Sequence, residues 1–492
     1  MGQCRLPCHL KESDIEHLPE TSVDADLHGL KPARRCPTNK THACFGLPSD
    51  GNDTEREKRW SQIVATATPH VPKLLALAEE VAGNLQFLEM TVMSKRELHQ
   101  MFKSRSMVLQ RYSPLSSVPA ALKAELIQVA RADPQASRAL GCLVGSAVGD
   151  ALGAPLEFID VTDTENRWNR VDEDFKLVGG LNKFHVKPGQ WTDDCAMALC
   201  MADSLLAHHE FNGSDIRIRF YNWWFRGYNN SFANDTRPPG SVGLGGNVAS
   251  SLSDMAPHRT PPPFFQSHTE DSGNGSLMRL GPIPVFYSKD PLQAARMSAQ
   301  SSYTTHPGPI AAAACAFLGY LLARAITMGE GEFAGGNRSF LDGVVREFLQ
   351  LDLAEARDCA ELRRMLKSDE PEGREQCWNW RGKTLALERS FEIRGHQYNG
   401  YPSNAGYFGS YCIDGLAMAL HSFYNTSNFN DAVRRCVNFL GDADSTASMV
   451  GQIAGAFYGI QGIRPELVDR LYQWDDDGEI ECRAALLHVA RQ

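Results

Sequence analysis

GCLVGSAVGDALGA (residues 141–154) and SMVGQIAGAFYG (residues 448–459) are the stretches of this 492-residue sequence that decide the fold. Each repeats glycine at every fourth position: Gly141, Gly145, Gly149 and Gly153 in the first, and Gly451, Gly455 and Gly459 in the second. This spacing places the glycines on one face of a helix. Glycine costs roughly 1 kcal/mol relative to alanine inside a helix, so each stripe indicates that another helix or a ligand approaches the backbone closely.

The sequence around these stripes also has a helical pattern. From about Pro134 onward, Ala/Leu/Gly-rich periodic segments dominate, and alternating runs of Val, Ile and Thr are scarce. We therefore predict an all-α fold. Further helices are expected near residues 193–209, 214–225, 291–302, 308–327, 339–352, 411–424, 429–440 and 464–473, with Gly/Pro/Asn-rich loops at 229–284 and 366–410.

The amino-terminal region differs from the rest of the chain. Residues 1–58 are rich in polar residues and proline and lack apolar periodicity, which predicts a largely disordered tail. Residues 59–133 are expected to form a helical N-terminal extension, because apolar side chains recur there at three- and four-residue steps: Leu74, Leu77, Ala78, Val81, Leu85 and Leu88. The main domain is assigned to 134–475 and a C-terminal tail to 476–492.

Charge and cysteine content limit the classes of function. The chain has 49 basic and 59 acidic residues, a formal net charge of -10, so it lacks the overall positive field of an unspecific nucleic-acid binder. Its 13 cysteines are scattered, and neither a secretory signal nor an apolar run of membrane length is evident. We therefore expect an intracellular, cytoplasmic protein that binds neither nucleic acid nor membrane.

Two dense groups of oxygen-bearing side chains stand at expected helix starts. One is Thr192-Asp193-Asp194 in GQWTDDCAMAL, and the other is Asp442, Asp444 and Ser445 in GDADSTAS. Either group alone has an ordinary interpretation, because Thr, Asp and Ser cap helices and acids in the first turn complement the helix dipole. One cap needs one side chain, however, and the surplus carboxylates repel one another unless a cation neutralises them. Carboxylate and hydroxyl ligands favour magnesium or manganese over zinc.

Five segments resemble, in order, the motifs of the ADP-ribosylglycohydrolase family: GCLVGSAVGDALGAPLEF, PGQWTDDCAMAL, DSGNGSLMRLGPIPV, TTHPGPIAAAACAFLG and GDADSTASMVGQIAGAFYG. The resemblance covers about residues 137–462. It implies that 134–475 is an orthogonally packed, all-α catalytic domain with two Mg²⁺ ions, or Mn²⁺, at the bottom of a cleft. The metal ligands carried over from the family would be Thr192, Asp193, Asp194, Asp442, Asp444 and Ser445.

The resemblance also implies a substrate site. Glu157 matches a glutamate near the ribose and the metals, and Asn274 with Gly275 matches a loop that meets the diphosphate and ribose. His306 and Tyr411 match substrate-site positions, the latter near the adenosine. Asn247 matches the family's glycine-asparagine loop.

Three positions depart from the family pattern. Ser445 stands where the family most often has threonine, but it keeps the hydroxyl oxygen, and Cys195 replaces another threonine outside the ligand set. Relatives that act on ADP-ribosylarginine often have an aspartate shortly before Asn247, where this chain has Leu244-Gly245-Gly246. This absence puts arginine specificity in doubt, with Asp254 and Asp271 as nearby acids.

The implied reaction is Mg-dependent hydrolysis of the glycosidic bond between ADP-ribose and a modified acceptor, through an oxocarbenium-like state. Its expected catalytic residues are Glu157, Asp193 and Asp444, and proton transfer falls to Glu157 or to one of the metal-binding aspartates. The partner would be an ADP-ribosylated protein or a small ADP-ribose conjugate, with arginine, serine, a free guanidine or an O-acetyl ester as the acceptor. The alternatives are a catalytically inactive ADP-ribose-binding or structural protein of the same fold, and a two-metal phosphoesterase.

Overall fold

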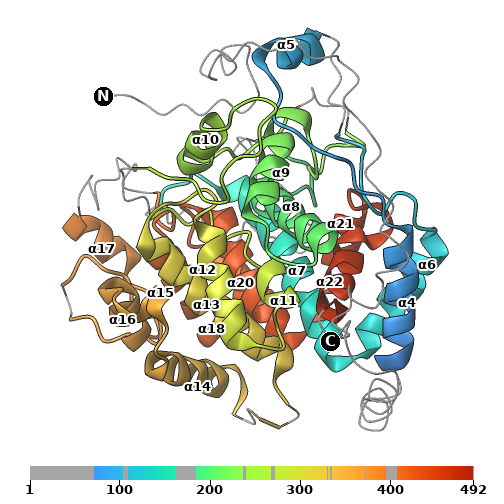
Figure 1. Cartoon of the computed structure of the whole chain (residues 1–492). Coiled ribbons are helices and arrows are strands. Elements are labelled where there is room, and N and C mark those ends of the chain that lie inside the picture. Colours follow the sequence, from blue (N-terminus) through green and yellow to red (C-terminus); the bar gives the residue numbers. More distant parts are fainter. Residues whose placement is uncertain are drawn as a thin grey trace.

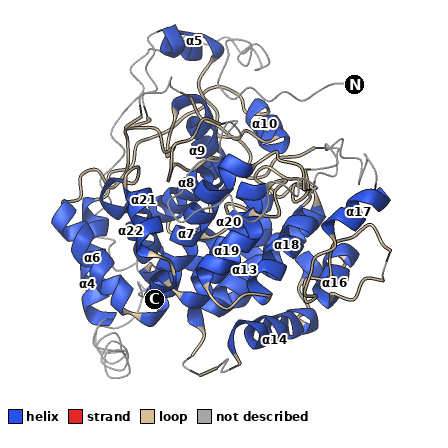
Figure 2. Ribbon diagram, turned by 180° about the vertical axis from the view of Figure 1, so that it is seen from behind, coloured by secondary structure: helices blue, strands red, loops and turns tan. Residues whose placement is uncertain are grey.

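The regular structure of this protein is helical (Figure 1). The computed structural model describes residues 71–103, 109–161, 184–235, 240–267, 272–329, 331–332, 335–371, 373–394 and 407–490. Within these ranges the ribbon contains helices and loops but no extended strand, and Gly273 and Tyr411 form an isolated β-bridge (Figure 2). The all-α prediction is confirmed. The predicted tail at 1–58 lies outside the described residues.

The helices expected in the main domain are present, with bounds shifted by a few residues. They are α8 (Asp193–His208), α9 (Gly213–Arg226), α12 (Pro291–Ser302), α13 (Pro309–Thr327), α14 (Gly336–Gln350), α18 (Cys412–Tyr424), α19 (Phe429–Val437) and α21 (Pro465–Tyr472). The segments expected to be loops contain short helices that the prediction lacked: α10 (Gly246–Ser253), α11 (Pro282–Phe286) and α17 (Leu387–Arg394). Two further short helices are α15 (Ala354–Arg357) and α16 (Ala360–Lys367).

The two glycine stripes face each other across the centre of the molecule. They lie on α7 (Pro134–Gly153) and α20 (Ala443–Tyr458). A Cβ atom added at Gly145 would lie 2.3 Å from the carbonyl oxygen of Gly451, and one added at Gly455 would lie 1.8 Å from that of Gly141. The close approach predicted from the stripes is therefore between two helix backbones. The order of these contacts makes the helices antiparallel, so the end of α7 meets the start of α20.

Helix α7 is longer than its glycine stripe. It begins at Pro134, where the side chain of Asp133 accepts a hydrogen bond from the Ala136 amide at 2.8 Å. By length and composition, Pro134–Leu156 and Pro309–Thr327 could each cross a membrane, so the expectation that no apolar run reaches membrane length is wrong. Their apolar windows are 100% and 83% buried inside the protein, which is the position of core helices.

The N-terminal extension contains α4 (Val71–Asn84), α5 (Lys95–Lys103) and α6 (Ala120–Ala132). Helix α4 buries Leu74, Leu77, Ala78 and Val81, so its predicted amphipathic face is confirmed. In Figure 1, α4 and α6 lie beside α22 (Glu479–Val489). This last helix occupies most of the segment assigned to a C-terminal tail, and it packs against α7 and α8 with all of its residues buried.

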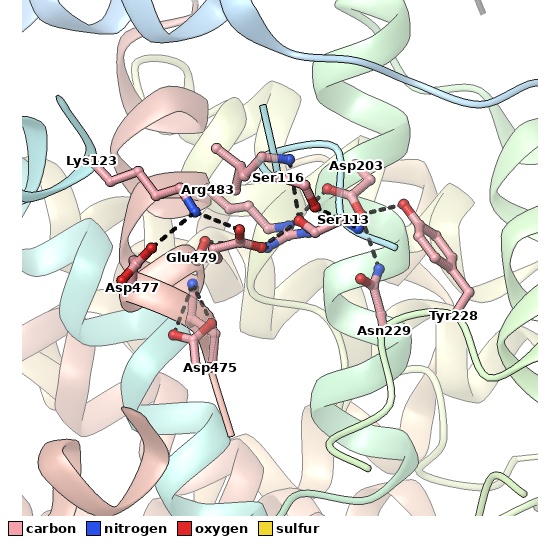
Figure 3. Close-up of polar contacts among 12 residues, drawn as sticks. Ser113, Ser116, Lys123, Asp203, Tyr228, Asn229, Asp475, Asp477, Glu479 and Arg483 are labelled. Atoms are coloured by element: carbon pink, nitrogen blue, oxygen red, sulfur yellow. Dashed lines mark hydrogen bonds and ion pairs between the residues drawn. The ribbon is translucent and has the colours of Figure 1, made fainter. Parts of the chain in front are cut away.

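Polar contacts join the extension to α22 and α8 (Figure 3). Lys123 of α6 contacts Glu479 Oε1 at 2.8 Å, and Ser113 donates a hydrogen bond to the same carboxylate. Arg483 Nε contacts Asp203 Oδ1 of α8 at 2.8 Å. The Lys123, Glu479, Arg483 and Asp203 side chains are at most 7% exposed, so these ion pairs lie inside the protein.

Candidate metal and substrate site

The antiparallel pair of α7 and α20 assembles the acidic residues. A Cβ atom at Gly153, the last residue of α7, would lie 2.4 Å from the Cα atom of Asp444 in the first turn of α20. Glu157 follows three residues of 3-10 helix (Ala154–Leu156) after α7. One ligand atom each of Glu157, Asp442 and Asp444 lies within 4.8 Å of the other two, and all three residues are buried. The core packing therefore brings Glu157, Asp442 and Asp444 from distant parts of the sequence into one buried acidic group, which we call the acidic pocket.

The second acidic group is held against the first by Asp150 of α7. Its carboxylate accepts hydrogen bonds from the Thr192 amide at 2.9 Å, from Thr192 Oγ1 at 2.8 Å and from the Cys195 amide at 3.0 Å. The start of α8, with Asp193 and Asp194, is thereby fixed to α7. Asp150 performs the capping that the ordinary interpretation gave to Thr192.

The ordinary interpretation of the two acidic groups is wrong about side-chain capping at both helix starts, although Asp193, Asp194 and Asp444 do lie in first turns. Thr192 is the N-cap residue of α8 and Asp442 that of α20, yet neither side chain makes a cap hydrogen bond. Asp442 Oδ2 instead accepts a hydrogen bond from Asn274 Nδ2 at 2.9 Å. Neither side chain is used to cap its helix.

Four buried carboxylate oxygens accept no hydrogen bond from the protein: both of Asp194, Oε2 of Glu157 and Oδ1 of Asp442. A buried carboxylate oxygen without a partner is costly, and neighbouring negative charges add repulsion. Burial first, and then the nearby acids, raise the pKa of Glu157, Asp194 and Asp444 well above the usual carboxyl range. A cation removes both penalties, so the residues present fit a hard metal such as Mg²⁺.

The remaining predicted ligands also border this pocket, although the compact group does not include them. Burial raises the pKa of Asp193 and of Asp194 well above the usual carboxyl range, and the charges of Asp150 and Asp442 raise both further. Ser445 donates its amide to Asp444 Oδ1 at 2.8 Å, and its hydroxyl lies 3.5 Å from Met278 Sδ. Glu157, which the sequence assigned to proton transfer, lies in the same compact group as the predicted metal ligands Asp442 and Asp444.

Asn274 connects the acidic pocket to the predicted substrate loops. Its amide donates to Ser410 O, and its side chain donates to both Gly409 O and Asp442 Oδ2, each at 2.9 Å. The bridge between Gly273 and Tyr411 continues this pairing, so the structure brings predicted residues Asn274 and Tyr411 together.

His306 lies beside the same loop. A Cβ atom at Gly275 would lie 2.9 Å from His306 Cε1, so glycine permits this contact. His306 Nδ1 lies 2.7 Å from Thr305 Oγ1, and burial, with the nearby Arg279 charge, lowers the pKa of the imidazole well below its usual range. A neutral His306 can therefore donate or accept a hydrogen bond at the site.

The glycine-asparagine loop approaches the site from another direction. A Cβ atom at Gly243 would lie 1.7 Å from Asp193 Oδ1, so this loop packs directly on the acidic group. Asn247 lies four residues further on, in the first turn of α10, and is half-buried. Asp254 forms an ion pair with Arg217 at 3.2 Å, and Asp271 lies outside the described residues.

Sequence reasoning missed three residues at this site. Asp150 had a usable signal, because it is the one charged residue between Arg138 and Glu157. Tyr407, whose hydroxyl donates to Glu157 Oε1 at 2.5 Å, lies in the long loop and had no such signal. Arg279 is fully buried, donates to Thr305 Oγ1 at 2.6 Å and has its pKa lowered to about 10 by burial.

An ion pair fastens the loop that carries Tyr407. Asp414 of α18 contacts Arg394 Nη1 at 2.7 Å and accepts a hydrogen bond from Trp378 Nε1 at 2.9 Å. The Arg394 guanidinium also lies 4.2 Å from the ring centre of Phe408, whose carbonyl accepts the Asp442 amide at 2.8 Å. These contacts hold residues 407–411 against the start of α20.

Comparisons with known proteins identify relatives over most of the described structure. The sequence model of the ADP-ribosylglycohydrolase family matches residues 131–492. The chain is 29% identical over 336 residues to ADP-ribosylarginine hydrolase Tri1 of Serratia proteamaculans, covering 68% of this chain and 75% of that protein. It is 27% identical over 327 residues to the ADP-ribosyl-(dinitrogen reductase) glycohydrolase of Rhodospirillum rubrum, covering 66% and 87%.

The chain is also similar to a vertebrate protein and to a solved structure. The chain is 26% identical over 350 residues to ADP-ribosylhydrolase ARH3 of Bos taurus, covering 66% of this chain and 86% of that protein. A solved structure titled ADP-ribosylglycohydrolase-related protein complex matches with a TM-score of 0.51 and 25% identity, covering 73% of this chain and 99% of that one.

Proposed function

Because this chain belongs to the ADP-ribosylglycohydrolase family, we propose that it is a Mg²⁺-dependent hydrolase that cleaves the glycosidic bond between ADP-ribose and a modified acceptor. The observation that carries this proposal is the set of buried carboxylate oxygens of Glu157, Asp194 and Asp442 that accept no hydrogen bond. A protein that bound no cation there would be more stable with apolar or amide side chains at these positions, so the carboxylates support a metal site.

The metal would be held by Asp193, Asp194, Asp442 and Asp444, with Thr192 and Ser445 contributing hydroxyl oxygens. When bound, Mg²⁺ would supply Lewis-acid activation and a fixed point for the ribose hydroxyls. Asn274 keeps Asp442 in place from the substrate side. Gly275 and Gly409 let the loops pack closely on His306 and on Thr446 of α20, which places the loops beside the acids.

Glu157 is the residue best placed to move a proton. Its Oε1 is held by the Tyr407 hydroxyl, and its Oε2 has no protein partner. Glu157 would take a proton from the attacking water or give one to the departing acceptor. Asp193 and Asp444 remain the other candidates for this role, because both have raised pKa values from burial and neighbouring charges.

The acceptor is a matter for experiment. Two relatives carry names that specify ADP-ribosylarginine or ADP-ribosylated dinitrogen reductase as substrate. In this chain Asp254, an acid near Asn247, is already paired with Arg217. We therefore propose testing arginine, serine, free guanidine and O-acetyl conjugates of ADP-ribose side by side with one preparation. Release of AMP instead of ADP-ribose would identify the phosphoesterase alternative.

Asp444→Asn and Asp193→Asn test the function directly. Both variants should lose ADP-ribose release by at least about a hundredfold, because each removes a charged group from the reacting site. Mg²⁺ should raise the Tm of the wild-type protein, because it neutralises the crowded carboxylates, and should raise that of the variants much less. EDTA should abolish the wild-type activity.

Asp469→Asn is the matched control, since Asp469 is an exposed acid on α21. It should leave both activity and the Mg²⁺-induced rise in Tm unchanged. Unchanged activity in both Asp444→Asn and Asp193→Asn would contradict the metal-dependent mechanism. A Mg²⁺-induced rise in Tm without release of ADP-ribose from any acceptor would identify the inactive binding protein.

A further inference from the structure

A second hollow lies away from the acidic pocket, between α14, the turn after α18, and α19. Its volume is about 590 Å³, and its lining includes Asn337, Arg338, Asn425, Asp431, Arg434 and Arg435. Helix α18 begins beside Tyr411 and ends at Tyr424, next to this hollow. Its 13 residues span about 20 Å at 1.5 Å per residue, so the hollow is separate from the acidic pocket.

The three arginines of this hollow have no carboxylate partner among the residues the structure describes. Arg338 donates Nε to the Tyr424 carbonyl at 3.0 Å. Arg435 donates Nη2 to the Lys383 carbonyl at 2.9 Å, while its buried Nε has no partner. The Arg434 side chain makes no hydrogen bond or ion pair with any described residue.

Other arginines of the same region are neutralised. Arg381 contacts Asp342 of α14 at 2.8 Å, and Arg324 contacts Glu347 of α14 at 3.0 Å. The single acid that lines the hollow is Asp431, and its carboxylate accepts a hydrogen bond from Asn428 at 2.7 Å. The hollow therefore has an excess of positive charge in a chain whose formal net charge is -10.

Helix electrostatics explain only part of this arrangement. Arg434 and Arg435 lie in the last turn of α19, where positive charge is favourable. Arg338 is the third residue of α14, and positive charge near a helix N-terminus is unfavourable. The Arg338 guanidinium lies 5.2 Å from the ring centre of Tyr424, but no carboxylate among the described residues offsets its charge.

We propose that this hollow is a binding site for a small phosphate-bearing molecule. Guanidinium groups match phosphate oxygens in bidentate geometry, and three of them can neutralise a diphosphate. The volume falls within the range of about 300–1,000 Å³ that is usual for small-molecule sites. The Asn337 and Asn425 side chains donate to backbone carbonyls of the surrounding turn, so the wall of the hollow is already formed without a ligand.

Isothermal titration calorimetry with inorganic pyrophosphate, and separately with ADP, tests this site. Arg338→Ala and Arg434→Ala should each weaken pyrophosphate binding by about tenfold, the usual effect of losing one charge-assisted contact. Both residues are exposed, so both variants should fold. Arg346→Ala is the matched control, because Arg346 is an exposed arginine on the same helix and does not line the hollow. It should bind pyrophosphate as the wild type does.

The two probes separate the possible sources of the phosphate. Equal affinity for ADP and pyrophosphate supports recognition of the diphosphate alone, and tighter ADP binding that both variants weaken supports a nucleotide site. The proposal is overturned if pyrophosphate does not bind at millimolar concentration, or if Arg338→Ala and Arg434→Ala bind it as tightly as Arg346→Ala does. The titrations contain no hydrolysable substrate, so their result is independent of the proposed hydrolase activity.

Discussion

The hydroxyl of Tyr407 makes a short hydrogen bond to the acidic pocket. It donates to Glu157 Oε1 at 2.5 Å, while the tyrosine ring stacks on Phe158 with ring centres 5.1 Å apart. Phe158 follows Glu157 directly and has a positive φ of 68°. The contacts of Tyr407 therefore fix both the direction of the Glu157 carboxylate and the backbone that carries it.

Tyr407→Phe should lower kcat/KM for ADP-ribose release by about tenfold, because it removes a hydrogen bond to a charged group but keeps the ring stack. The Tm should change by no more than a few degrees. Tyr320→Phe provides the matched control, since Tyr320 is a buried tyrosine of α13 whose hydroxyl also donates to a glutamate, Glu347, at 3.2 Å. Wild-type kcat/KM in Tyr407→Phe would show that the hydroxyl does not orient Glu157 for the reaction.

At the scale of single residues, the sequence identifies candidate site residues only where they lie within recognisable motifs. Asn274 and Tyr411, which the resemblance assigned to different parts of the substrate, lie at the bridge between Gly273 and Tyr411, and the acids at the starts of α8 and α20 lie near each other. Tyr407 could not be predicted, because its role depends on how a long loop folds back on Glu157. The partner of Asp150 could not be predicted either, since the contact with Thr192 joins residues 42 positions apart.

At the scale of elements, the α7–α20 pair determines where the acids meet. A Cβ atom at Gly145 would lie 2.3 Å from a backbone carbonyl of α20, and backbone cannot rotate away as a flexible side chain can. The glycine stripes predicted this contact because repeated glycines destabilise a single helix. A close contact with another backbone can offset that loss of stability. Helices α10 and α17 were missed because each has only eight residues, too few for a clear period.

Gly145→Ala should lower the free energy of unfolding by about 1–3 kcal/mol, because the two helices must separate to admit the methyl group. This direction is opposite to the gain of up to ~1 kcal/mol that alanine gives in an unconstrained helix. Gly83→Ala in α4 is the control, since nothing lies within 4 Å of its added Cβ atom. Chemical denaturation followed by circular dichroism measures both, and equal stability changes would contradict the close packing of α7 on α20.

At the scale of the whole molecule, the N-terminal extension is part of the packed core. Lys123 of α6 reaches Glu479 at the start of α22, and Arg483 of α22 reaches Asp203 of α8 (Figure 3). Helix α8 carries Asp193 at its other end. The sequence predicted helices in the extension but not their attachment, because the periodicity of a helix shows that it has a buried face without showing what covers that face.

Two lysine–glutamate pairs with the same separation test this attachment. Lys123 lies 2.8 Å from Glu479 with side chains 4% and 7% exposed, and Lys73 lies 2.8 Å from Glu125 with side chains 56% and 46% exposed. Lys123→Met should lower the free energy of unfolding by about 3 kcal/mol, because it leaves a buried carboxylate less well neutralised. Lys73→Met should change it by less than about 1 kcal/mol, as is usual for exposed pairs.

The Lys123→Met variant also tests whether the N-terminal extension unfolds together with the rest of the protein. Because the Glu479 carboxylate also contacts Arg483, which holds Asp203 of α8, the loss of stability should extend to the main domain. Guanidinium unfolding should therefore move to lower denaturant concentration by the same amount whether it is followed by circular dichroism or by the loss of ADP-ribose release. If full activity persisted beyond the circular dichroism transition, the extension would unfold separately from the rest of the protein. If the denaturation midpoints of Lys123→Met and Lys73→Met shifted equally, burial would not strengthen the contact.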